Sequence, residues 1–179
     1  MKHILFLQGG GGQEDYKADA KLVASLREHL PDNYSIHYPV LKDDSSPDFG
    51  RMKQIQQEIA IIAEKMILVA HSLGASMLLK YLSEHEVVNE ISGVFLLATP
   101  YWSGDEDWVK GLMLQEDFAS SMVRVPTFLY HCLDDEIVPF DHFTRYQQKL
   151  PTATFRTMPS GGHQFNNDLQ LVAKDILTL

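Results

Sequence analysis

Ser72 stands where a strongly apolar segment meets a segment of helical character. Residues 66–69 are all apolar, and residues 75–82 would be apolar on most sides of a helix. This order predicts a buried strand that turns directly into a helix, with a serine at the turn. Such a turn exposes the hydroxyl group and directs the free N–H groups at the start of the helix toward it. The arrangement is typical of a serine that attacks a carbonyl group.

A serine hydroxyl is a weak nucleophile, so a base must take its proton and a third group must orient that base. His163 follows the strand expected at 154–158, and the acidic residues 134–136 follow the strand expected at 127–132. Because the carboxyl ends of parallel strands meet at one edge of a sheet, both groups should lie beside Ser72. The sequence therefore predicts that a serine, a histidine and a carboxylate gather at one edge.

His71 is the alternative base, because it directly precedes the serine. Adjacent residues at a tight turn point in different directions, however, and a base must reach the serine hydroxyl. We therefore expect His163 to be the base and His71 to be a neighbour without that role. The other histidines form no His-x-x-x-His or His-Glu-x-x-His pattern, so we expect no metal site.

The elements that must position these residues alternate along the chain between short apolar runs and segments of helical period. Strands are expected at 4–8, 35–38, 66–70, 93–98, 127–132 and 154–158, and helices at 22–30, 52–62, 75–84, 140–150 and 168–177. This alternation predicts a parallel α/β sheet with right-handed crossovers. The last strand is more polar than the others, so we expect it near an edge of the sheet.

Residues 99–124 interrupt this rhythm, because they are too many for a routine connection. They follow the carboxyl end of a strand, where binding sites gather in sheets of this kind. Two interpretations stay open. The segment is either a small lid or wall over the site, or a crossover with a short helix whose aromatic residues pack on the sheet.

The composition fits one globular domain over residues 1–179. The net charge of −9 and the lack of basic runs argue against a nucleic acid or an anionic membrane as partner. The single cysteine, Cys132, excludes an internal disulfide and is expected to be a buried strand residue. The first apolar stretch is too short for a secretion signal, which favours a cytoplasmic protein.

Three motifs together resemble those of the α/β-hydrolases. Ala70-His71-Ser72-Leu73-Gly74 is similar to their Gly-x-Ser-x-Gly turn, with alanine at the first small position. Asp135-Glu136-Ile137-Val138-Pro139 is similar to their Asp-x-x-Val-Pro segment, and Gly162-His163 to the Gly-His before their last helix. The chain resembles the compact serine hydrolases of the YdeN and retinoblastoma-binding-protein-nine type.

The resemblance implies a three-layer α/β-hydrolase fold in its compact version, with about six mostly parallel strands and helices on both faces. It implies a catalytic triad of Ser72, His163 and Asp135. We expect Asp134 to be a solvated turn residue, with a part in shaping the turn as the alternative. It also implies a serine hydrolase that cleaves a carboxylic ester through an acyl-enzyme without a cofactor. The alternatives are a thioesterase, an amidase, or a protein-interaction module with weak turnover.

Two backbone N–H groups should stabilise the oxyanion that forms during acyl transfer. One is that of Leu73, directly after the serine. The other comes from the loop Gly9-Gly10-Gly11-Gly12, where relatives begin with His-Gly and this chain has Gln8-Gly9. We expect Gly10 to be the second donor, with Gly11 as the alternative. The loop lacks a phosphate-binding or dinucleotide-binding pattern, since Glu14 and Asp15 occupy the positions that would need glycine.

The expected partner is a small-molecule acyl substrate, while a protein partner stays open and the sequence does not indicate an oligomeric state. Four aromatic residues could form an apolar pocket for the acyl group, although ordinary packing explains each of them equally well. They are Tyr101, Trp102, Trp108 and Phe165.

Overall fold

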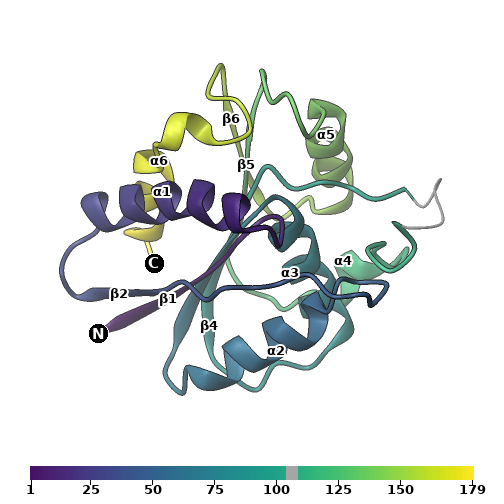
Figure 1. The fold of residues 1–179 in the computed structure, drawn as a ribbon, viewed down its shortest axis with the longest axis horizontal. Coiled ribbons are helices and arrows are strands. Elements are labelled where there is room, and N and C mark those ends of the chain that lie inside the picture. Colours follow the sequence, from purple (N-terminus) through teal and green to yellow (C-terminus); the bar gives the residue numbers. More distant parts are fainter. Residues whose placement is uncertain (104–108) are drawn as a thin grey trace.

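The computed structural model describes residues 1–103 and 109–179, and these form a six-stranded, wholly parallel sheet between two layers of helices (Figure 1). The order across the sheet is β2-β1-β3-β4-β5-β6. The strands are β1 (Lys2–Leu7), β2 (Tyr34–His37), β3 (Met66–His71), β4 (Ile91–Leu97), β5 (Thr127–Cys132) and β6 (Thr154–Met158). The predicted parallel α/β architecture is confirmed.

The helices pack their apolar sides against opposite faces of this sheet. On one face lie α1 (Gln13–His29) and α6 (Gln170–Ile176), which run side by side in Figure 1. On the other face lie α2 (Arg51–Ile61), α3 (Ser72–Glu84), α4 (Phe118–Ser121) and α5 (Phe140–Lys149). A short 3-10 helix, η2 (Phe165–Asn167), precedes α6. Each face therefore has its own apolar core.

Burial of the strands follows their place in the sheet. Every residue of β3 is buried, because β3 is central and helices cover both of its faces. The edge strand β6 is only partly buried and carries Arg156 and two threonines. The prediction of an edge position for this polar strand is confirmed.

Several helix boundaries differ from the predicted ones, and the starts of α1 and α6 have identifiable reasons. Helix α1 begins at Gln13, well before the predicted start at residue 22. Its first turn carries Glu14 and Asp15, which favour a helix N-terminus but contribute no apolar stripe to reveal it. Helix α6 begins at Gln170 rather than at 168, because the preceding backbone is left-handed at Asn166 and Asn167.

The described parts of segment 99–124 pack on the α3 face of the sheet. Leu112 and Phe118 are buried in the core there, and Phe118 begins the short helix α4. Gly111 lies so close to Pro47 that a β-carbon at this position would collide with its backbone. At these positions the segment is a packed crossover. Within the described ranges, no helix combines the length and apolar character needed to cross a membrane.

Candidate active site

Ser72 occupies a strained turn between β3 and α3. Its φ of +50° lies in the left-handed region, which a residue with a side chain rarely adopts. The turn also requires close contact between α3 and the end of β1. A β-carbon on Gly74 would lie 2.2 Å from the backbone oxygen of Gln8, so only glycine fits there. Ala70 is fully buried. These two small residues let the helix start directly behind the serine.

The structure brings Ser72, His163 and Asp135 together from the carboxyl ends of β3, β6 and β5. His163 Nε2 lies 3.0 Å from Ser72 Oγ. On the other side of the ring, His163 Nδ1 lies 3.0 and 3.1 Å from the two carboxylate oxygens of Asp135. The Asp135 side chain is 1% exposed and that of His163 is 10% exposed. A base could therefore take the serine proton while a buried carboxylate orients it.

Asp135 is held in its ionised form by its hydrogen bonds. Burial alone would raise the pKa of this carboxyl group, but His163 and the N–H groups of Val138 and Ile137 donate to it and bring the pKa below its ordinary value. An ionised Asp135 accepts the N–H of His163 Nδ1, which leaves Nε2 free to face Ser72.

Both acidic neighbours of Asp135 bind the loop that carries His163. The Asp134 carboxylate accepts hydrogen bonds from the N–H groups of Gly161 and Gly162, at 3.2 and 2.9 Å. Glu136 accepts one from the backbone N–H of His163 at 3.0 Å. Asp134 is an exposed turn residue, as expected, and its carboxylate in addition binds these two N–H groups. The two glycines adopt positive φ angles of 146° and 60°, which place their N–H groups toward the acidic loop.

The glycine loop after β1 is held by aspartates at three of its four N–H groups. Gly9 donates to Asp19 at 2.8 Å. Gly11 and Gly12 donate to two other carboxylates, Asp43 at 3.1 Å and Asp15 at 3.0 Å. The N–H of Gly10 donates to none of the residues that the structure describes. Of the two glycines that the sequence left as alternatives, Gly11 therefore has an aspartate acceptor for its N–H, and Gly10 has none among the described residues.

The same loop lies directly against the serine. A β-carbon on Gly9 would be only 3.1 Å from Ser72 Cβ. The Gln8 side chain, buried at the end of β1, donates to the carbonyl of Gly10 at 2.7 Å and accepts the N–H of Leu41 at 2.9 Å. Gln8 therefore fixes the course of the loop beside the serine from within the core.

Sequence reasoning did not identify Asp19 as part of this site. Asp19 is 1% exposed and stands on the buried side of α1 with Leu22, Val23 and Leu26. A carboxylate at that spacing within an apolar stripe is the signal that could have revealed it, because a buried charge needs a partner. That partner is His71, whose Nδ1 lies 2.9 Å from Asp19 Oδ1. The Nε2 of His71 bonds the backbone oxygen of His163 at 3.0 Å.

The aromatic residues expected near the acyl group lie in different environments. Trp102 is half-buried and donates from Nε1 to Ser76 Oγ at 3.1 Å, one helical turn beyond Ser72 on α3. Tyr101 is half-buried and packs edge-on against Tyr146. Phe165 is 5% exposed and lies in the core beside His71, a position that favours packing over substrate contact. Trp108 lies outside the described residues.

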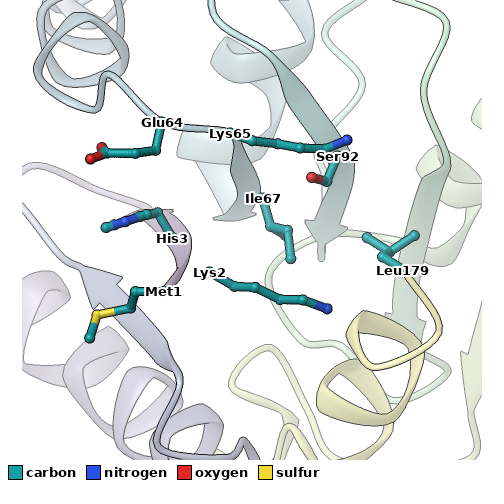
Figure 2. Close-up of a pocket in the computed structure, with 8 residues that line it drawn as sticks. All are labelled: Met1, Lys2, His3, Glu64, Lys65, Ile67, Ser92 and Leu179. Carbon is teal, nitrogen blue, oxygen red and sulfur yellow. The ribbon is translucent and has the colours of Figure 1, made fainter.

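A cavity of about 440 Å³, whose lining residues are shown in Figure 2, lies away from this site. It is lined by residues near the amino ends of β1 and β3, including His3 and Ile67, and by Leu179. Ser72 follows the carboxyl end of β3, so the cavity lies at the opposite end of the strands. It has no part in the geometry of the serine.

Comparison with known proteins gives one family and a common fold. The family model described as "Serine hydrolase" matches residues 27–171. No curated protein matches the chain in sequence. The ydeN gene product of B. subtilis is 18% identical, with a TM-score of 0.70 over 99% of this chain and 97% of that one.

Two further solved structures are similar at low identity. Est1E of Butyrivibrio proteoclasticus, solved with ferulic acid bound, is 12% identical, with a TM-score of 0.72 over 98% of this chain and 86% of that one. A lipase-esterase related protein of Clostridium acetobutylicum is 13% identical, with a TM-score of 0.68 over 99% of this chain and 93% of that one. These similarities establish the α/β-hydrolase fold of the chain.

Proposed function

Because the chain belongs to the serine hydrolase family, we propose that it cleaves a carboxylic ester through an acyl-enzyme formed on Ser72. The observation that carries this proposal is the placement of His163 between its two partners. One ring nitrogen lies 3.0 Å from Ser72 Oγ, and the other lies 3.0 Å from Asp135 Oδ2. That is hydrogen-bonding reach for a nucleophile, its base and the group that orients the base.

In the first half-reaction, Ser72 Oγ attacks the ester carbonyl while His163 Nε2 takes the hydroxyl proton. The tetrahedral intermediate collapses, the bond between the carbonyl carbon and the alcohol oxygen breaks, and His163 returns the proton to the departing alcohol. In the second half-reaction, water attacks the acyl-enzyme with His163 again as base. The products are a carboxylic acid and free Ser72. Asp135 stabilises the transient imidazolium and does not itself take the proton.

The N–H groups of Leu73 and Gly10 are the proposed donors to the oxyanion. Leu73 follows the serine in the first turn of α3, where N–H groups have no partner within the helix. Gly10 is supported by the occupation of the neighbouring N–H groups by Asp19 and Asp43. Donors fixed in this way before the reaction need no reorganisation as charge develops.

An ester is favoured over other acyl compounds by the names of the similar structures. One similar protein is described as lipase-esterase related, and Est1E is described with a carboxylic acid, ferulic acid, bound. A site beside Trp102 and Tyr101 would offer apolar contact to an acyl group. Thioesters and amides are the alternatives, and a panel of matched esters, thioesters and amides of graded acyl length would rank them.

Labelling by a fluorophosphonate probe tests the proposed nucleophile. We expect the wild-type protein to be labelled and Ser72→Ala to give no labelling. Ser83→Ala is the matched control, because this serine lies on the same helix and its hydroxyl bonds only the Lys80 carbonyl among the described residues. Wild-type protein that hydrolyses no ester and is not labelled at Ser72 would overturn the proposal and favour an interaction module on a hydrolase fold.

A further inference from the structure

We propose that His71 and Asp19 form a buried ion pair that positions the glycine loop and the His163 loop relative to Ser72. This inference rests on the proposed hydrolysis, since positioning matters only if Ser72 reacts. Both residues lie outside the predicted triad. They come from different elements, Asp19 from α1 and His71 from the last position of β3.

Asp19 uses both carboxylate oxygens on parts of the site. Oδ2 accepts the N–H of Gly9 at 2.8 Å, and Oδ1 accepts from Gln164 Nε2 at 3.2 Å. Gly9 directly precedes the proposed oxyanion donor, and Gln164 directly follows the proposed base. One carboxylate on α1 thus holds both loops that must meet at the serine.

The contacts of His71 require a proton on both ring nitrogens. Nε2 faces the carbonyl oxygen of His163, which can only accept a hydrogen bond. Nδ1 faces Asp19 Oδ1 at 2.9 Å, in an ion pair whose N–H is not well aligned for a hydrogen bond. A neutral ring with its proton on Nε2 would turn a lone pair toward a carboxylate. His71 is therefore an imidazolium paired with an ionised Asp19.

The charges around His71 support this state. Burial alone would lower the pKa of His71, but Asp19 and the carbonyl of His163 raise it above the ordinary histidine value, with a smaller contribution from Asp135. The same pair lowers the pKa of Asp19 despite its burial. The ring of His163 lies 4.7 Å from that of His71, centroid to centroid. Both side chains are almost fully buried, so solvent screens the pair little.

The pair thereby connects three segments whose relative positions must be fixed for the reaction. His71 is covalently attached to Ser72 and hydrogen-bonded to the backbone of His163, while Asp19 binds Gly9. Loss of the pair would let the loops shift relative to the serine. A misplacement of about 1 Å can reduce a rate on the order of 100-fold, even when the mutated residue touches no substrate.

Nitrogen NMR of histidine-labelled wild-type protein tests the ion pair without any variant. We expect both ring nitrogens of His71 to give the chemical shift of protonated imidazolium at pH 7, and we expect Asp19→Asn to abolish this signature. Two different shifts, one of them typical of an unprotonated ring nitrogen, would show a neutral His71 in the wild-type protein. That result would overturn the ion pair whatever the variants do.

Ester kinetics test the positioning role. For Asp19→Asn and His71→Asn we expect kcat to fall on the order of 10-fold to 100-fold, with KM changed by less than about 2-fold, because orientation rather than binding is lost. The control is Asp175→Asn, which weakens the contacts of a buried carboxylate on α6 with Arg156 and Tyr130. It should lower stability and leave kcat unchanged.

The outcomes separate the two proposals. Wild-type protein without activity refutes the proposed hydrolysis. If the wild-type protein is active and the Asp19→Asn and His71→Asn variants have the same kcat as Asp175→Asn, the positioning role is refuted. The proposed hydrolysis is then unaffected. If the double variant has a kcat no lower than that of the slower single variant, the two residues act together as one unit.

Discussion

The Nε2 atom of His71 lies 3.0 Å from the backbone oxygen of His163, which follows it 92 positions later in the sequence. His71 is bonded through the peptide chain to Ser72, and His163 faces the Ser72 hydroxyl. The separation of nucleophile and base is therefore set twice, once by their own hydrogen bond and once by this backbone contact. The turn at Ser72 and the loop at His163 form one connected unit.

Asp135→Asn should greatly reduce turnover of an ester. The amide NH₂ of asparagine can face His163 Nδ1, which favours the tautomer whose proton is on the wrong nitrogen. We expect kcat to fall on the order of 10⁴-fold, with the fold retained. Steady-state kinetics on a p-nitrophenyl ester would measure this loss. Asp141→Asn is a matched control, because that carboxylate is exposed and pairs only with Arg145 among the described residues; retention of a tenth of the activity by Asp135→Asn would contradict the orienting role.

The fluorophosphonate adduct should reveal the oxyanion donors. The phosphoryl oxygen of the adduct imitates the oxyanion, so we expect it to lie roughly 2.7–3.1 Å from the backbone nitrogens of Leu73 and Gly10. A crystal structure of the labelled protein would measure both distances. If the oxygen instead lies on the N–H of Gly11, that group must have left Asp43, and our choice between the two glycines is wrong.

Much of the fold could be predicted because its signals are local. The apolar run at 127–132 coincides with the observed β5, since an apolar strand covered on both faces needs no other signal. The more polar edge strand β6 also has its predicted bounds, 154–158. The start of α1 could not be found in the same way. Its first turns are polar and exposed, and its buried side there includes a charged group, Asp19.

The site was predictable only to the level of its motifs. The sequence placed Ser72, Asp135 and His163 near one edge, because each follows a parallel strand. It did not indicate that Asp19 would reach Gly9, or that Asp134 would bind the His163 loop. Such contacts join residues that are distant in the chain. The carboxylates mostly accept from backbone N–H groups, and these contacts cannot be recognised from residue types.

Asp134→Ala should slow the reaction by loosening the loop that carries the base. The pKa of this carboxyl group is lowered chiefly by the N–H of Gly162, which shows that the loop contact favours the ionised form. Without it, Gly161 and Gly162 lose their acceptor, and we expect kcat to fall about 10-fold through misplacement of His163. Kinetics and hydrogen exchange at both glycine amides would test this. Unchanged exchange at these two amides would show that the contact does not order the loop.

Gly74→Ala should destabilise the protein by about 1–3 kcal/mol or more, because the new methyl group would collide with backbone. The β-carbon would lie 2.2 Å from the oxygen of Gln8 and 2.9 Å from that of Leu7. Gly12→Ala is the control, since its β-carbon would meet only the movable carboxylate of Asp15. We expect that variant to stay within about 1 kcal/mol of wild type. Urea unfolding of both variants would measure the difference, and equal stabilities would argue against the tight contact at the turn.

The stability that His71 contributes should decrease as the pH rises. The pKa of His71 is raised in the folded protein, so its contribution is complete below the unfolded value of about 6.5 and is lost as the pH rises through the folded value. The pKa of Asp19 is lowered, so its contribution is present above about 3.9 and is lost as the pH falls through its folded value. Both contributions are therefore complete between about pH 4 and 6.5.

This window can be measured as the difference in free energy of unfolding between wild type and His71→Asn. We expect about 3 kcal/mol at pH 6, because the variant leaves Asp19 buried without its cation. The difference should shrink steadily as the pH rises above about 6.5, because unfolded His71 then releases its proton while folded His71 keeps it. Comparing the two proteins at each pH cancels the titration of groups that do not interact with His71. A difference that grows between pH 6 and pH 9 would mean that His71 is neutral when folded, because only a lowered pKa gives stability that increases with pH.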